Sequence, residues 1–443
     1  MPFGRCWIGR RVLFGLTAAL ALGAATVHAT PYLVVDADSD QVLMENEATA
    51  PWFPASLTKL VTVYVALDAV RSGKLTLDTP LVMSARAARM PPSKMGFRPG
   101  TEVTLDNALK MLMVKSPNDV AVMVAEGVSG SVEAFADDMN AAAQRLGMHE
   151  SHFVNPNGLH NPAHVSSARD MAIVARALLR EFPDHADLFS IGALQLGRQY
   201  IANHNGLLGR YPGADGMKTG FTCPAGFNVV ASANHSGRRL IVVVLGAPTA
   251  KSRNQEAADL FDRGFAGGGG NGSLESLPSG SGPAPNMRAD VCLHRSAALI
   301  AAAEDAGFAG PGEAAVGSAA GRAGMLPTPL AALFAPIAHT ELPDGRIRFD
   351  PVPVYIGPAP GWKGPALGVR RTTTETAAAP DGAKTISAAA GGANTPEGDA
   401  GAPTQPSSKS KLKLSRHTEK RMAAHKPAKR TAEKLEKKDV STE

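Results

Sequence analysis

A serine and a lysine three residues apart could form a nucleophile and its base near the start of the chain. The stretch FPASLTKLVTVYVALDAV, residues 53–70, places Ser56 and Lys59 at the start of an apolar, helix-compatible segment. A serine hydroxyl needs a base within hydrogen-bond reach, and a lysine can serve when burial and nearby cations favour its neutral amine. The same spacing recurs in the low-complexity residues 408–413. For the pair alone, a capping serine beside a surface lysine is therefore the better explanation.

Two later motifs reverse that preference. Ser116-Pro117-Asn118 lies between helix-compatible segments, and Lys218-Thr219-Gly220 occurs once, in a strand-compatible segment. Ser-x-Asn has little weight by itself, because it also matches elsewhere in the chain. The order Ser-x-x-Lys, Ser-x-Asn, Lys-Thr-Gly is the signature of serine β-lactamases and penicillin-binding proteins. The ordered set is far more specific than any one motif, and it favours chemistry at Ser56.

Helices and strands must hold these motifs in place. Residues 31–48 predict two strands around an Asp/Ser turn, which would form an antiparallel hairpin. A helix is expected to begin at residues 54–56, because apolar residues then repeat at helical spacing. Positions three apart share a helix face, so Ser56 and Lys59 would lie side by side at its N-terminus, where free N–H groups favour developing negative charge. Residues 238–247 predict a strand that follows the Lys-Thr-Gly segment.

The sequence between the motifs resembles one family. Blocks such as FRPGTEVTLDNAL, FADDMNAAAQRLGM and FVNPNGLHNPAHVSSARDMA look like those of the low-molecular-mass penicillin-binding proteins that are serine D-alanyl-D-alanine carboxypeptidases. The resemblance covers residues 31–265 and implies an α/β fold of the α+β type, the serine β-lactamase/penicillin-binding-protein transpeptidase-like fold. In that fold an antiparallel sheet is flanked by helices, and the site lies between the sheet and a helical region. Departures from the family pattern at Pro117, His204 and Phe221 bear on substrate preference and pH dependence.

The resemblance also implies an activity and a role for each motif residue. The activity is removal of the terminal D-Ala from peptidoglycan pentapeptide stems through an acyl-enzyme on Ser56, with Lys59 as base and Ser116 relaying the proton. Backbone N–H groups of Ser56 and Phe221 would hold the oxyanion. The substrate-binding residues implied are those of the later motifs and one arginine, namely Asn118, Lys218, Thr219, Gly220, Phe221 and Arg253. For Arg253, a surface position at the start of a helix is an equally good explanation. β-Lactams are expected inhibitors, and neither a cofactor nor a metal is expected.

Composition divides the chain into segments. Residues 1–29 carry arginines before an apolar run and a small-x-small site, which predicts a signal peptide, with an uncleaved anchor as the alternative. Residues 30–266 are the expected catalytic domain. Residues 285–370 are expected to form a small β-rich domain, because residues 346–358 resemble a strand whose prolines suit a sheet edge. Residues 377–443 predict a disordered linker and basic tail.

Charge and cysteine content indicate the compartment and the partners. Residues 409–443 hold 12 Lys/Arg and 5 Asp/Glu, while the whole chain has a net charge of +5, so the body is slightly acidic. Nucleic-acid binding is therefore not expected, whereas the tail could bind an anionic membrane or cell-wall surface. Cys223 and Cys292 remain after signal removal and can form one disulfide in an oxidising compartment. We expect an exported, periplasmic protein, with attachment to the outer face of the inner membrane left open.

The motifs and the fold also allow other functions. A D,D-endopeptidase or a β-lactamase would share the motifs, and a non-catalytic cell-wall-binding protein would share the fold. The histidines between residues 149 and 164 could suggest a metal site, but no His-Glu-x-x-His occurs, and loop or capping histidines are the better explanation. For Cys223, a small buried cysteine is a better explanation than a thiol nucleophile, because no His/Asn partner pattern is evident.

Overall fold

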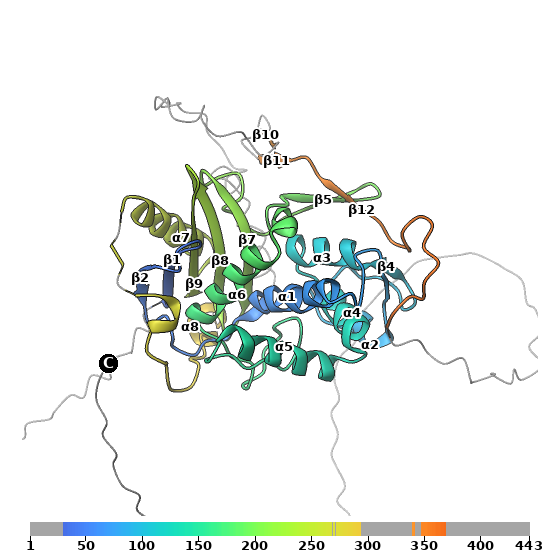
Figure 1. The fold of residues 1–443 in the computed structure, drawn as a ribbon, viewed down its shortest axis with the longest axis horizontal. Coiled ribbons are helices and arrows are strands. Elements are labelled where there is room, and N and C mark those ends of the chain that lie inside the picture. Colours follow the sequence, from blue (N-terminus) through green and yellow to red (C-terminus); the bar gives the residue numbers. More distant parts are fainter. Residues whose placement is uncertain (1–29, 268, 271, 294–338, 342–346, 369–443) are drawn as a thin grey trace, which may run out of the picture. The chain divides into compact units, whose positions relative to one another are not determined.

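The computed structural model describes residues 30–267, 269–270, 272–293, 339–341 and 347–368 (Figure 1). The signal peptide expected over residues 1–29 and the tail expected over residues 377–443 lie outside these residues. Within the described part of the chain, no helix has both the length and the apolar character that crossing a membrane requires.

A five-stranded antiparallel sheet lies at the centre of the fold. Its strands follow the order β2-β1-β9-β8-β7, with the bounds β1 Tyr32–Asp36, β2 Val42–Asn46, β7 Ala214–Thr222, β8 Gly226–His235 and β9 Arg238–Ala247. The hairpin predicted over residues 31–48 is confirmed as β1 and β2. Ser236 and Gly237 join β8 to β9 with φ of 52° and 86°, the left-handed values that tight two-residue hairpin turns use.

Strand β9 shows why the sheet is buried on both faces. Its residues alternate in direction, so Val242 and Val244 join the core under one face while Ile241 and Val243 join the core under the other. Helix α7, Ala250–Phe265, packs on the first face, and the larger helical region lies on the second (Figure 1). A strand covered on both faces reads as a continuous apolar run, as RRLIVVVLGA does.

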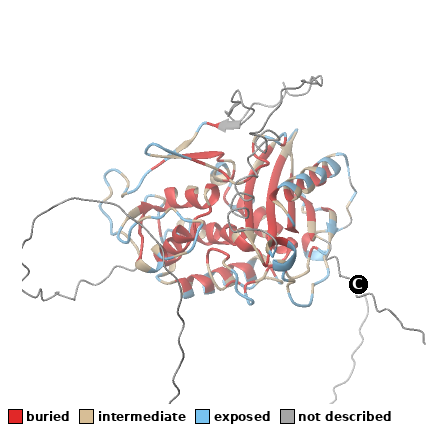
Figure 2. Ribbon diagram, turned by 180° about the vertical axis from the view of Figure 1, so that it is seen from behind, coloured by how far each residue is buried: buried red, intermediate tan, exposed pale blue. Residues whose placement is uncertain are grey.

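The helical region surrounds α1, whose side chains are buried nearly all round. Figure 2 shows this buried centre and the exposed outer side of α7. Helix α1 spans Thr58–Arg71. The other helices are α2 Ala85–Ala88, α3 Leu105–Val114, α4 Asn118–Ser129, α5 Val132–Leu146, α6 Ala168–Glu181 and α8 Arg288–Cys292. The 3-10 turns of the described residues are η1 Ala55–Leu57, η2 Pro183–Phe189 and η3 Leu274–Ser276. Because α1 meets apolar neighbours on most sides, packing fixes the position of this helix and of Lys59 in its first turn.

Smaller sheets lie around this core. Strands β3 Pro80–Val82 and β4 Glu102–Thr104 form an antiparallel ribbon, as do β10 His339–Glu341 and β11 Ile347–Phe349. Strand β12, Val352–Val354, pairs in parallel with β5, Ala193–Leu196, which pairs with β6, Gln199–Ala202. The strand expected within residues 346–358 is thus confirmed at a sheet edge, where Pro353 is tolerated. A separate β-rich domain over residues 285–370 stays a prediction.

Candidate active site

The first motif spans a 3-10 turn and the first turn of α1. Ser56 lies in η1 and is partly exposed, while the side chain of Lys59 is fully buried. Lys59 Nζ lies 3.0 Å from Ser56 Oγ, so the predicted pairing of hydroxyl and amine is present in the structure. Ala55, just before the serine, has φ of 48°. A non-glycine residue in this region is unusual, and such conformations cluster at functional sites.

Lys59 Nζ also contacts two carbonyl oxygens. It lies 2.9 Å from Asn118 Oδ1 and 2.8 Å from Asn157 O. Carbonyl oxygens only accept hydrogen bonds, so these contacts use two of the amine hydrogens. A neutral amine at Nζ can direct its lone pair at Ser56 Oγ, 3.0 Å away. The arrangement can therefore remove the hydroxyl proton.

The second motif lies between α3 and α4. Ser116 has φ of 58°, and its buried Oγ has no hydrogen-bond partner among the described residues. Asn118 begins α4, and its Nδ2 donates to the carbonyls of Pro91 and Pro92, both at 3.1 Å. The sequence led us to expect that Asn118 binds substrate. In the structure both ends of its amide bind the protein, so that role stays a prediction.

The third motif lies on β7, the edge strand of the main sheet, next to η1. Lys218 is buried and its Nζ donates to Thr219 O at 2.8 Å. A Cβ atom at Gly220 would lie 3.0 Å from the backbone nitrogen of Ser56, which is closer than side chains normally approach. Glycine at this position therefore allows β7 to run directly beside the nucleophile.

A cleft of about 250 Å³ opens where the three motifs meet. All the predicted site residues line it except Lys59, which is buried and contacts the lining residues Ser56 and Asn118. Sequence reasoning missed several lining residues outside the motifs: Pro92, Ser93, Asn157, Gly158 and Leu159 come from loops, and Thr222 ends β7. His204, which the sequence marks as a departure from the family pattern, also lines the cleft.

The charges around the cleft are positive. Lys218 and Arg253 line it, and none of its described lining residues is Asp or Glu. Arg253 is buried in the first turns of α7, where Nε and Nη2 donate to Asn254 Oδ1 at 3.0 and 2.8 Å. Burial, together with the cations Lys115, Lys218 and Arg253, lowers the pKa of His204 to about 3. His204 is therefore neutral near pH 7, and the cleft favours an anionic group.

A buried hydrogen-bond chain supports the backbone before the nucleophile. Val154 N donates to His164 Nδ1 at 3.1 Å, which leaves Nε2 as the donor to Thr58 Oγ1 at 2.8 Å. Thr58 Oγ1 in turn donates to Ala55 O at 2.8 Å. Burial, with repulsion from two other histidines, lowers the pKa of His164 to about 3, so the ring stays neutral. His164, one of the histidines that could suggest a metal site, thus supports the backbone of Ala55 through Thr58.

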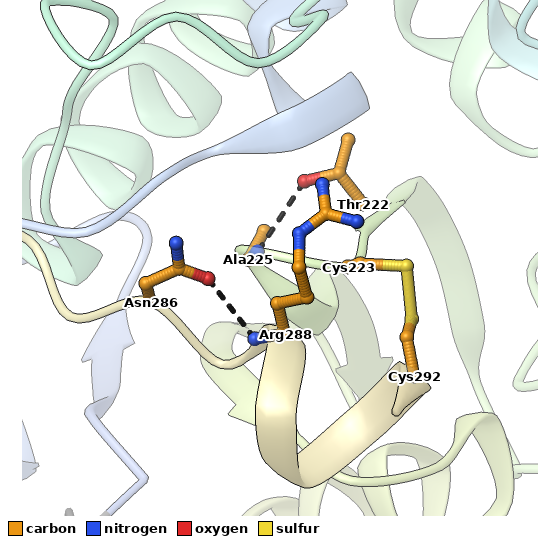
Figure 3. Close-up of a disulfide and its surroundings, with 6 residues drawn as sticks. All are labelled: Thr222, Cys223, Ala225, Asn286, Arg288 and Cys292. Atoms are coloured by element: carbon orange, nitrogen blue, oxygen red, sulfur yellow. Dashed lines mark hydrogen bonds between the residues drawn. A yellow bond between two sulfur atoms is a disulfide. The ribbon is translucent and has the colours of Figure 1, made fainter. Parts of the chain in front are cut away.

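The two cysteines form a disulfide at the edge of the site. Figure 3 shows Cys223 in the turn after β7 and Cys292 at the end of α8. The bond ties the strand that carries the third motif to a segment 69 residues away in the sequence. The sequence-based disulfide is confirmed, and the alternatives for Cys223, a nucleophilic thiol and a free buried cysteine, are wrong.

Comparison with known proteins identifies similar molecules. The profile of peptidase family S11, described as D-alanyl-D-alanine carboxypeptidase, matches residues 18–249. The carboxypeptidase DacA of Haemophilus influenzae is 38% identical over 246 residues, which are 54% of this chain and 62% of that protein. DacF of Bacillus subtilis is 35% identical over 240 residues, 53% of this chain and 61% of that protein. The chain thus spans less than two thirds of these relatives.

Solved structures agree on the fold. Penicillin-binding protein 5 of H. influenzae superposes with a TM-score of 0.52 at 37% identity, over 54% of this chain and 71% of that one. A D-alanyl-D-alanine carboxypeptidase of Mycobacterium tuberculosis gives 0.51 at 32% identity, over 55% of this chain and 94% of that one. The expected transpeptidase-like fold, with an antiparallel sheet flanked by helices, is confirmed.

Proposed function

Since the chain belongs to peptidase family S11, the D-alanyl-D-alanine carboxypeptidases, we propose that it removes the terminal D-Ala from peptidoglycan pentapeptide stems. The observation that carries this proposal is the 3.0 Å contact between Ser56 Oγ and the buried Lys59 Nζ, at a cleft lined by all three motifs. Acyl transfer needs a nucleophile, a base and charge stabilisation within one such site.

Acylation begins when Lys59 Nζ takes the proton of Ser56 as Oγ attacks the carbonyl carbon between the two D-alanines. The carbonyl oxygen becomes an oxyanion that accepts hydrogen bonds from the backbone N–H groups of Ser56 and Phe221. Collapse of this intermediate breaks the C–N bond. The leaving amine receives the proton through the Ser116 hydroxyl, which has no other partner among the described residues. Water then attacks the ester, releases the shortened peptide and restores the serine.

The positive end of the cleft selects the substrate. A peptide that ends in D-Ala carries a free carboxylate, and Lys218 with Arg253 supplies the positive charge to bind it, helped by the Thr219 hydroxyl. Because His204 is neutral near pH 7, it adds hydrogen-bonding capacity and no charge. A carboxylate next to the scissile bond is the mark of a carboxypeptidase substrate.

β-Lactams should acylate the same serine and leave it slowly. The loop of residues 147–167 lies between the second and third motifs. Its one glutamate, Glu150, is the candidate base for deacylation. Its carboxylate is buried and lies 3.1 Å from Arg169 Nη2, and it does not line the cleft. Hydrolysis of a bulky penicilloyl ester on Ser56 would therefore be slow, because no carboxylate of this loop activates the water.

Intact-protein mass spectrometry with a labelled penicillin tests the proposal. The unaltered protein should gain one penicilloyl mass, and Ser56→Ala should gain none while its circular dichroism spectrum is unchanged. D-Ala release from a pentapeptide, measured beside a cross-linked muropeptide dimer and penicillin, separates a carboxypeptidase from an endopeptidase or a β-lactamase. A Ser56→Ala protein that still takes the label would refute the assignment, and an unaltered protein that takes none would favour the non-catalytic alternative.

The same proposal includes the cellular place of the protein. We infer export to the periplasm with removal of residues 1–29, supported by the disulfide, which needs an oxidising compartment. The basic residues 409–443 supply electrostatic attraction to an anionic lipid or cell-wall surface. Binding to anionic vesicles should weaken steeply with salt and disappear when these residues are deleted. Salt-resistant association of the signal-cleaved protein would contradict this view of the tail.

A further inference from the structure

Residues 347–368, here called the C-terminal strap, lie along the catalytic unit. Near its start Phe349 is buried against Gly192, where any Cβ atom would overlap the phenyl ring. Strand β12 then pairs in parallel with β5. The strap lies outside residues 18–249, which match the family profile, so membership of the family does not explain it.

The strap binds both edges of the ribbon formed by β3 and β4. At the β4 edge, Gly357 N donates to Glu102 O at 2.6 Å. At the β3 edge, Leu367 N donates to Pro80 O and Val82 N donates to Leu367 O, both at 2.7 Å. A two-stranded ribbon is marginally stable by itself, and its open edges leave backbone groups unpaired. The strap satisfies such groups on both sides.

The ribbon carries one wall of the cleft. Residues 83–101 connect β3 to β4, and Pro92 and Ser93 of this loop line the cleft. The loop is bonded to the second motif, because Asn118 Nδ2 donates to Pro92 O at 3.1 Å and Asn118 N donates to Ser93 O at 2.7 Å. Asn118 Oδ1 accepts from Lys59 Nζ at 2.9 Å. Hydrogen bonds and the intervening backbone therefore connect the strap, through the ribbon and its loop, to the amine of Lys59.

We propose that the C-terminal strap is a positioning element for the active site. By closing both edges of the ribbon it keeps the connecting loop against Asn118, and Asn118 holds Lys59 Nζ at Ser56. None of the described lining residues of the cleft belongs to the strap, so its part is positioning. The prediction for acylation rests on the proposed function, whereas the prediction for hydrogen exchange does not.

A substitution of Leu367 in the full chain tests the proposal. Leu367→Pro removes the N–H that bonds Pro80 O, whereas the control Leu367→Met keeps this donor and the apolar side chain. Loss of one such bond should raise the open population of the ribbon about fivefold. Amide hydrogen exchange in a peptide covering residues 84–101 should quicken by that factor, with β9 unchanged. The acylation step at saturating labelled penicillin should slow about fivefold.

The possible results separate the alternatives. Faster exchange with unaltered acylation would mean that the strap only stabilises the ribbon, and unaltered exchange would mean that it does not hold the ribbon; both overturn the proposal. Phe349→Ala, which removes the ring beside Gly192, should shift both readouts in the same direction and serves if Leu367→Pro does not fold. An unaltered chain that fails to acylate overturns the proposed function, whereas an unaltered chain that acylates, together with variants that acylate at the same rate, overturns only the strap's positioning role.

Discussion

Removal of the Cys223–Cys292 disulfide should lower the free energy of unfolding by about 4 kcal/mol. The cysteines are 69 residues apart, so the bond closes a long loop that contains β8, β9 and α7. In the chain-entropy description, closing a loop of n residues removes about 2.1 + 1.5R ln n cal/mol/K from the unfolded chain. For this separation the stabilisation is about 4.4 kcal/mol at 25 °C.

Urea unfolding of the Cys223→Ala/Cys292→Ala double variant measures this loss. Trp52 provides the signal, because it is buried and its Nε1 donates to Ala225 O at 2.9 Å, close to the disulfide. With a slope of about 2 kcal/mol per molar urea, the midpoint should fall by about 2 M. The unaltered protein under a reducing agent is the matched control and should show the same shift.

A small shift would refute the reasoning. If the midpoint falls by less than about 0.5 M with the slope unchanged, loop closure does not contribute at the calculated level. A changed slope would instead locate the effect in residual structure of the unfolded chain. The comparison requires that fluorescence and circular dichroism report the same two-state transition.

Other residues allow further tests. Thr58→Val should leave His164 Nε2 without its acceptor and lower the free energy of unfolding by about 1–3 kcal/mol; Thr58→Ser should not, and equal losses in both variants would contradict the hydrogen-bond chain. The penicilloyl adduct on Ser56 should persist for minutes in mass spectra, since Glu150 is bound elsewhere; rapid multiple-turnover penicilloate formation would contradict this. Burial raises the pKa of Asp170 well above its ordinary value, so the folded protein keeps a proton that the unfolded chain releases. The free energy of unfolding should therefore fall as pH rises above about 4, and urea titrations of Asp170→Asn should show a flatter dependence.

The contact between Ser56 and Lys59 could be predicted because its signal is local, although its interpretation as nucleophile and base needed the two later motifs. Ser56 and Lys59 are fixed by helical spacing, and the hairpin of β1 and β2 by alternation around a turn. The third motif was placed on a strand correctly for the same reason. None of these predictions required knowledge of which distant segments meet.

The remaining contacts of the site could not be predicted in this way. Lys59 is held by the main-chain carbonyl of Asn157, and a carbonyl has no residue signature. His164 reaches Thr58 across 106 positions of the sequence, so its role depends on tertiary packing. The contacts of both ends of the Asn118 amide also depend on distant residues, and its expected contact with substrate stays a prediction. The strap pairs short strands with distant partners, which periodicity does not reveal.

The positive lining of the cleft should raise the association rate of anionic ligands. Lys218 and Arg253 face a pocket with no carboxylate among its described lining residues, on a body whose charge outside residues 409–443 is slightly negative. Such a local field draws an anion over about a Debye length, roughly 8 Å at physiological ionic strength, and guides its diffusion. Association of an anionic ligand should therefore slow as salt is added, while the bond-making step at Ser56 keeps its rate.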